Sequence, residues 1–186
     1  NQLPDTLADI KNLKTLTIGY NPLIELPEWI GNFEELYKLD LDGLHLSEVP
    51  KWLPKLKKLR IVYLENNKLR ELPYLGSEML KLEKLYLCNN YLADFHEYFT
   101  TTHTLLEINI GSNYLTKIPF SSFIYPRLRK IWLQNNYIKH VPKVLCTAEQ
   151  LYVLNLANHP IPMLPAYMGK LRNLDELNLL GLKLNR

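Results

Sequence analysis

The chain has little cysteine and no long apolar run. Only two of its 186 residues are cysteines, Cys88 and Cys146, which excludes the dense disulfide framework of small secreted domains. No apolar stretch approaches the roughly 18 residues that a membrane-spanning helix needs, so the sequence predicts no membrane span. The net charge of +3 is mild, and by itself it does not indicate nucleic acid or an anionic membrane as a partner.

Sequence patterns that carry catalysis are missing as well. There is no Gly-Lys-Ser/Thr phosphate loop and no Gly-x-Ser-x-Gly nucleophile turn. Residues 40–43, Asp-Leu-Asp-Gly, resemble the start of a phosphatase or calcium loop, but a calcium loop needs a glutamate where this chain has Lys51. The histidines fall without paired metal-ligand spacing: His45, His96, His103, His140 and His159. We therefore predict no enzyme activity, no catalytic residue, no metal site and no cofactor.

What the chain does have is leucine at a fixed interval. Eight leucines follow one another 23 residues apart: Leu13, Leu36, Leu59, Leu82, Leu105, Leu128, Leu151 and Leu174. Counted from that leucine, the fourth, sixth and eleventh positions are aliphatic in every repeat, and the fourteenth is apolar and usually followed by proline. Each repeat therefore reads LxxLxLxxNxLxxLPxxxxxLxx. Residues 1–12 read as the returning half of a further repeat, so we assign 1–186 to one repeat domain with a partial N-terminal repeat.

This pattern resembles the leucine-rich-repeat family along the whole chain. The 23-residue form with Leu-Pro is similar to repeats of bacterial surface or effector proteins and of the Ras-suppressor type of intracellular scaffold. The resemblance implies an α/β solenoid, a curved horseshoe with a parallel β-sheet on the concave face. Short helical or irregular segments are expected on the convex face.

Strand geometry leads to the same arrangement. Side chains alternate between the two faces of a strand, so the fourth and sixth positions face inward while the fifth faces out. One repeat cannot bury its apolar face alone, and its neighbours must supply the other wall. Terminal repeats need polar caps, and none is recognisable here. We therefore expect exposed apolar surface around Leu3, Leu7 and Leu179, unless further sequence or another chain covers it. Self-association through these uncapped ends and a chain that is a fragment of a longer protein are the two alternatives.

Asparagine marks the ninth position of the repeat. Its amide group can both donate to and accept from backbone groups where the chain leaves the strand, so stacked asparagines predict a hydrogen-bonded ladder: Asn21, Asn67, Asn90, Asn113 and Asn136. Three repeats depart from the pattern, with Leu44, His159 and Leu182 at this position. We expect the ladder to break at Leu44 and at the C-terminal end.

The returning segments differ in their proline content. Pro27 and Pro50 each stand at a plausible first position of a short helical turn. The segment Phe95 to Thr104 has His96 where the others have proline, and the segment Ser121 to Pro126 is interrupted by a proline. We expect the latter segment to be irregular.

The fifth position is the most informative about function, because it projects from the middle of the concave sheet. Tyr63, Tyr86 and Trp132 occupy it in three of four consecutive repeats, with Asn109 between the last two. Folding does not require aromatic rings there, and such rings are the usual anchors of protein interfaces. Cross-strand packing on a β surface also favours them, and we rank the binding interpretation above it. The neighbouring seventh positions add Glu65 and Gln134 to the predicted partner-binding surface.

A second candidate surface is basic. Its residues lie near the start of the third and fourth strands: Lys55, Lys57, Lys58, Arg60 and Lys84. A solvated rim explains this run, and a dock for an acidic protein segment is the functional alternative. Nucleic acid is disfavoured because acidic residues are interspersed over the rest of the surface.

Together these patterns predict a protein–protein interaction module that holds a protein or peptide on its concave face. A bacterial surface, secreted or effector protein is one setting. An intracellular signalling scaffold and a structural spacer within a longer protein are the alternatives. The sequence is compatible with secreted, cell-surface and cytoplasmic locations, and it does not name the partner.

Overall fold

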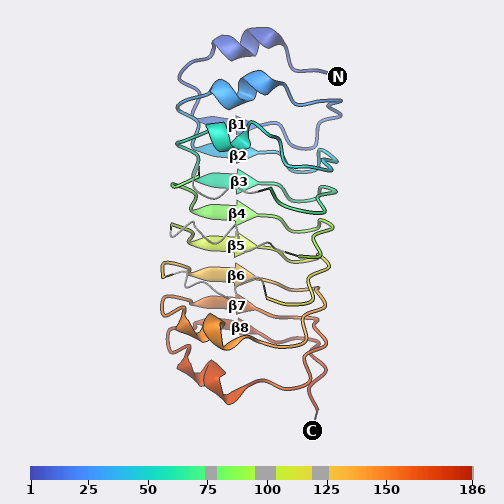
Figure 1. The fold of residues 1–186 in the computed structure, drawn as a ribbon, viewed down its shortest axis with the longest axis vertical. Helices are drawn as coiled ribbons and strands as arrows, with labels where there is room; N and C mark the ends of the chain where they lie inside the picture. Colours follow the sequence, from blue (N-terminus) through green and yellow to red (C-terminus); the bar gives the residue numbers. More distant parts are fainter. Residues whose placement is uncertain (74–78, 95–103, 119–125, 186) are drawn as a thin grey trace.

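The fold is a single stack of short parallel strands. The computed structural model describes residues 1–73, 79–94, 104–118 and 126–185. Its sheet has eight strands in sequence order: β1 (Thr15–Thr17), β2 (Lys38–Asp40), β3 (Ile61–Tyr63), β4 (Lys84–Tyr86), β5 (Glu107–Asn109), β6 (Lys130–Trp132), β7 (Val153–Asn155) and β8 (Glu176–Asn178). Figure 1 shows the strands one above another along the long axis, with the two termini at opposite ends. This is the curved, open leucine-rich-repeat solenoid that the 23-residue pattern predicts.

Register follows directly from the repeat. Each strand begins at the third position of its repeat, and every paired residue lies 23 positions from its partner, as in Leu39 with Val62. The central residue of the strand faces the core: Leu39 and Leu85 are buried, and Leu16 in the first strand is partly buried against the same core. The predicted inward orientation of the fourth position is therefore confirmed.

Short 3-10 helices form part of the returning side. The described residues include η1 (Asp5–Asp9), η2 (Glu28–Asn32), η3 (Leu53–Lys55), η6 (Lys143–Thr147) and η7 (Ala166–Lys170). The predicted helical turns are present, but Pro27 precedes the first helical residue in an extended conformation instead of occupying it. Pro50 lies three residues before η3, which contains Pro54. Most of the segments Phe95 to Thr104 and Ser121 to Pro126 lies outside the described residues.

The asparagine ladder closes the turn that follows each strand. Asn90 is buried, and its Nδ2 donates to the carbonyls of Leu64 (2.8 Å) and Leu87 (3.0 Å). Its Oδ1 accepts from the backbone amide of Leu69 at 3.0 Å. Asn67, Asn113 and Asn136 repeat these contacts. The bonds to Leu64 and from Leu69 join two successive repeats, so the ladder holds the turns together as well as satisfying each one.

The predicted breaks in the ladder are present. Leu44 is only 7% exposed and belongs to the apolar core. At the other end, neither ring nitrogen of the buried His159 completes a hydrogen bond in the described structure. The ring faces the backbone near Leu133 and Asn136. Burial lowers the pKa of His159, despite this favourable backbone contact.

A second ladder at the eighth position was missed at the sequence level. Every repeat has a left-handed residue there: Tyr20, Gly43, Asn66, Asn89, Ser112, Asn135, Asn158 and Gly181. Side chains link neighbouring repeats, with Asn89 Nδ2 donating to Asn66 Oδ1 at 2.8 Å. The signal was available, because asparagine and glycine tolerate positive φ better than other residues.

Candidate partner-binding surface

Two tyrosines form the centre of the candidate surface. The pairing of β3 with β4 places Tyr63 beside Tyr86, and their rings stack with centroids 4.7 Å apart and planes 6° apart. Both side chains are partly exposed on the face opposite the core. Stacking fixes the two rings against each other, which reduces the ordering cost for a partner that packs on them.

Polar groups surround the tyrosine pair. Tyr86 Oη donates to Glu107 Oε2 at 2.8 Å, and Asn109 Nδ2 donates to Glu65 Oε1 at 3.0 Å across two repeats. Burial, and then the hydrogen bond to Glu107, raise the pKa of Tyr86 well above its usual range. The Tyr86 hydroxyl is therefore neutral over the physiological range and holds this orientation.

Glu107 connects the tyrosine pair with two lysines of the sheet, one in β4 and one in β6. Its Oε1 lies 3.0 Å from Lys84 Nζ and 3.8 Å from Lys130 Nζ. Burial raises the pKa of Glu107, but the Tyr86 and Lys84 hydrogen bonds and the charges of both lysines outweigh it and lower the net value. The sequence analysis missed Glu107 and Lys130 at the third position, which alternation places on the same face as the fifth.

Trp132 stands apart from the tyrosine pair. Asn109 separates it from Tyr86 in the sheet register, and the Lys130 ammonium lies 5.8 Å from its ring centroid. The predicted row of fifth-position side chains therefore consists of the stacked Tyr63 and Tyr86 rings, the polar Asn109, and the Trp132 indole beside the Lys130 ammonium. All four side chains are partly buried rather than fully exposed.

Gln134 lies over a glycine. A side chain at Gly111 would meet the Gln134 amide, which would have to move from its present position. The Oε1 atom of Gln134 is buried and has no hydrogen-bond partner in the described structure. This leaves a polar atom beside Trp132 whose hydrogen-bonding capacity is unused.

Acidic side chains gather at the β2–β3 end of the surface. Burial raises the pKa of Asp42 to about 6, a hydrogen bond from the Glu65 backbone opposes it, and the charges of Asp40 and Glu65 add to it. That amide donates to Asp42 Oδ1 at 2.6 Å. Burial and then Asp40 also raise the pKa of Glu65.

The shift of Asp42 predicts a pH dependence of stability. The folded-state pKa of about 6 lies above the ordinary 3.8, so the folded chain binds the proton more tightly than the unfolded chain. The stabilisation is present below about pH 4 and is lost as pH rises through about 6. Because the side chain is only half buried, we expect a loss of about 1 kcal/mol rather than the full value of the shift.

Urea unfolding of the wild type and of Asp42→Asn, from pH 4 to pH 7.5, measures this contribution. The asparagine keeps the Oδ1 acceptor but not the charge, so its free energy of unfolding should exceed that of the wild type at pH 7.5 and match it near pH 4. A constant difference across the range would assign the effect to something other than ionisation of Asp42.

The predicted basic rim is dispersed and paired with acidic side chains. Lys55 lies on η3, on the returning side, 3.9 Å from Glu28. Arg60 lies 2.7 Å from Glu83. Lys58 pairs with Glu35, and Lys84 belongs to the Glu107 group on the sheet. Lys57 also has an interaction partner. These pairings leave less free positive charge than the residue list alone indicates.

A separate tyrosine row follows the turn edge. Tyr91, Tyr114 and Tyr137 occupy the tenth position, and successive ring centroids are 6.0 Å apart. The side chains are about half exposed. The rings contact one another along the stack, as the repeat spacing predicts, and lie away from the sheet surface.

Comparison with known proteins agrees with this geometry. The Leucine Rich Repeat family model matches residues 12–33. A leucine-rich-repeat protein of Leptospira interrogans superposes with a TM-score of 0.81 at 26% identity, covering 99% of this chain and 53% of that one. The chain is a leucine-rich-repeat protein. A search of curated protein sequences gave no significant match.

Two further structures share the leucine-rich-repeat fold. An internalin of Listeria monocytogenes superposes with a TM-score of 0.85 at 19% identity, covering 99% of this chain and 52% of that one. The plant peptide hormone receptor RGFR1 in complex with RGF2 gives a TM-score of 0.72 at 25% identity, covering 99% and 35%. This leucine-rich-repeat chain thus spans about half the length of the two bacterial proteins and a third of the receptor.

The described part of this leucine-rich-repeat chain differs from metal-binding and membrane-spanning proteins in two features. It has no cluster of three or more His, Cys, Asp or Glu side chains arranged to hold a metal ion. None of its described helices is long and apolar enough to cross a membrane. Cys88 and Cys146 are both free thiols.

Proposed function

We propose that this chain is a protein–protein interaction module that holds a protein or peptide on the concave face of its sheet. The observation that carries the proposal is the stacked pair Tyr63 and Tyr86, partly exposed on the face opposite the core. The surface extends through Asn109 to Trp132, a span of about 15 Å at the usual strand spacing. Glu65 and Gln134 flank it.

Aromatic anchors among polar side chains suit a protein partner better than a small metabolite. Interfaces concentrate their binding energy in a few Tyr, Trp and Arg side chains surrounded by polar groups. The surface is a row of short strands rather than a deep enclosed pocket, whereas small molecules favour concave sites. RGFR1, a structural neighbour, was solved with the peptide hormone RGF2, which supports a peptide or protein ligand here.

The setting of this module is the finer part of the proposal. We propose a bacterial surface, secreted or effector protein, and one structural neighbour at 26% identity is a bacterial leucine-rich-repeat protein. An intracellular signalling scaffold and a structural spacer in a longer protein are the alternatives. We propose one repeat domain over 1–186, no enzyme activity and no cofactor.

Affinity capture from the native host tests the binding proposal. Three baits are compared by quantitative mass spectrometry: the wild type, a Tyr63, Tyr86 and Trp132 triple alanine variant, and a Tyr91, Tyr114 and Tyr137 triple alanine control. The control removes the same number of aromatic rings from the turn edge. A partner held by the wild type and the control, but lost from the concave-face variant, supports the module. Identical captures by all three baits would contradict binding at this surface.

The end strand supports a second, homotypic contact. Leu177 in β8 is 46% exposed and Leu180 just after it is 71% exposed, and this strand pairs only with β7. We expect concentration-dependent self-association, because open sheet edges and apolar patches promote pairing. Light scattering during gel filtration should show a lower mass for a Leu177→Lys/Leu180→Lys variant, but not for Leu80→Lys as control. A wild type that remains monomeric at all concentrations would contradict it.

A further inference from the structure

The first two repeats are joined differently from the second to sixth repeats. In the third to sixth repeats, the backbone amide at the tenth position donates to the carbonyl at the eleventh position of the preceding repeat. The four bonds, each 2.8 Å, are Lys68 to Leu46, Tyr91 to Leu69, Tyr114 to Leu92 and Tyr137 to Leu115. Within the described residues no such bond joins His45 to Leu23. Leu23 instead donates to Asn21 at 2.8 Å, and His45 has a φ of 58°.

Leu44 explains why this junction differs. In later repeats, the ninth-position asparagine accepts the eleventh-position amide of the preceding repeat, as Asn67 does from Leu46 at 2.9 Å. Leu44 has no acceptor to offer Leu23. The two turns therefore lack both inter-repeat links, the amide bond and the side-chain bond.

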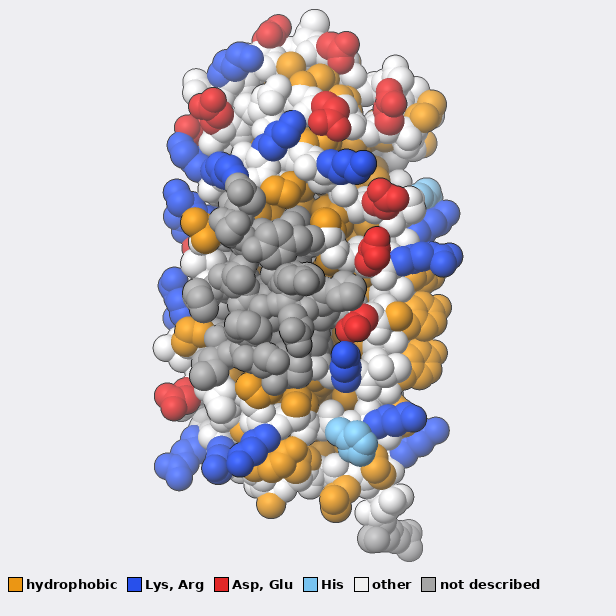
Figure 2. Space-filling model, in the orientation of Figure 1, with side chains coloured by type: hydrophobic (Ala, Val, Ile, Leu, Met, Phe, Trp, Pro, Cys, Tyr) orange, Lys and Arg blue, Asp and Glu red, His pale blue; other side chains and the backbone are white. Residues whose placement is uncertain are grey.

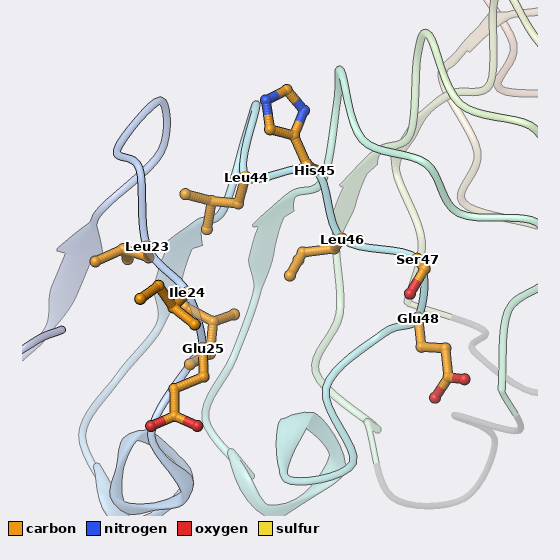
Figure 3. Close-up of a pocket in the computed structure, with 9 residues that line it drawn as sticks. Leu23, Ile24, Glu25, Leu44, His45, Leu46, Ser47 and Glu48 are labelled. Atoms are coloured by element: carbon orange, nitrogen blue, oxygen red, sulfur yellow. The ribbon is translucent and has the colours of Figure 1, made fainter. Parts of the chain in front are cut away.

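A hollow of about 440 Å³ lies between these two turns, and we name it the first-junction groove. Its walls include Leu23, Ile24, Leu44 and Leu46. Figure 3 shows the Leu44 side chain directed toward the chain segment that carries Leu23 and Ile24. Ile24 is 78% exposed, which is a high exposed fraction for a large aliphatic side chain. The volume lies within the range of about 300–1,000 Å³ typical of ligand pockets.

Carboxylates line one end of the first-junction groove. Figure 3 shows Glu25 and Glu48 at the same end of the groove, and Glu71 and Asp94 continue the thirteenth position along the next two repeats. Figure 2 shows Asp and Glu side chains following one another on this face beside the grey atoms. Glu25 accepts a hydrogen bond from the neutral Gln2 at 2.9 Å. No ion pair neutralises Glu25, Glu48 or Glu71 within the described residues.

We propose that the first-junction groove binds an extended segment of a partner protein in which aliphatic residues alternate with Lys or Arg. Alternate side chains of an extended chain point to opposite sides, so one set enters the apolar walls while the other meets Glu25 and Glu48. The unjoined His45 amide and Leu23 carbonyl offer the segment backbone hydrogen bonds, as in strand addition. This surface lies on the turn edge and is distinct from the concave face.

A seven-residue peptide of alternating Lys and Leu is a suitable probe. Fluorescence anisotropy should detect binding to the wild type that weakens as salt increases, because the carboxylates are exposed. Glu25→Gln/Glu48→Gln should weaken binding at least tenfold, whereas Glu149→Gln/Asp175→Asn, which removes two exposed carboxylates elsewhere, should leave it unchanged. The concave-face triple alanine variant should bind the probe like the wild type, which separates this site from the proposed function.

Two changes to the groove itself complete the test. Leu44→Asn should draw the turns together by supplying the missing acceptor for Leu23, and should abolish probe binding while the chain stays folded by circular dichroism. Ile24→Ser alters only an exposed wall residue and should weaken binding at least fivefold. Undiminished binding in both variants, equal binding of an alternating Glu and Leu peptide, or a probe that binds only through self-associated chains would overturn the proposal.

Discussion

Asn90→Leu is expected to lower the free energy of unfolding by about 2–6 kcal/mol. The substitution removes the acceptor of the buried Leu69 amide, and an unsatisfied buried donor costs about 1–3 kcal/mol. It also removes donations to the carbonyls of Leu64 and Leu87. These two carbonyls keep bonds from Asn67 and Asn113, so their losses are closer to about 0.5–1.5 kcal/mol each. Urea unfolding followed by circular dichroism measures the change.

Leu44→Asn is the matched control for Asn90→Leu. It places the missing amide at the same position of an earlier repeat, where it gains hydrogen bonds but gives up the buried leucine side chain. We expect it to be neutral or stabilising, within about 1 kcal/mol of the wild type. Comparable losses in both variants would mean that Leu44 stabilises the chain through packing as much as asparagine does elsewhere.

Trp132→Ala is expected to weaken binding of a concave-face partner about thirtyfold. Truncating an aromatic interface anchor typically costs about 2 kcal/mol or more, and 1.4 kcal/mol corresponds to a factor of ten. The fold should be intact by circular dichroism, because the indole lies on the face opposite the core. The affinity is measured by calorimetry with the partner identified by capture.

Tyr137→Ala serves as the control for Trp132→Ala, since it removes an exposed ring from the turn edge. Unchanged affinity in the Tyr63, Tyr86 and Trp132 triple alanine variant would move the binding site elsewhere. The basic residues from Lys55 to Arg60 would then be the next candidates, although their acidic partners would have to be displaced first.

The regular part of this structure could be predicted because a fixed period determines register. Once Leu13 and Leu36 are recognised as equivalent, strand positions, the buried fourth residue and the alignment of Tyr63 with Tyr86 all follow. The consequence of Leu44 for the ladder follows in the same way, because leucine lacks hydrogen-bonding groups. All of these features depend on position in the repeat and not on side-chain conformation.

The polar organisation of the surface could not be predicted in this way. Asn109 reaches Glu65 across two repeats, 44 residues away, and Glu107 collects Tyr86 and two lysines. Such contacts depend on the conformations that long side chains select among several partners. The first-junction groove was also missed, because the repeat pattern does not show which inter-repeat backbone bonds form.

The asparagine ladder also divides the solenoid mechanically. Its links run without interruption from Asn67 to Asn136, while Leu44 and His159 mark junctions without them. In a repeat protein each unit is held mainly by its neighbours, so opening should start at these junctions and leave a rigid central block. A partner bound on β3 to β6 would therefore contact the part of the solenoid that is hardest to deform. A segment bound in the first-junction groove would contact a part that can change shape on binding.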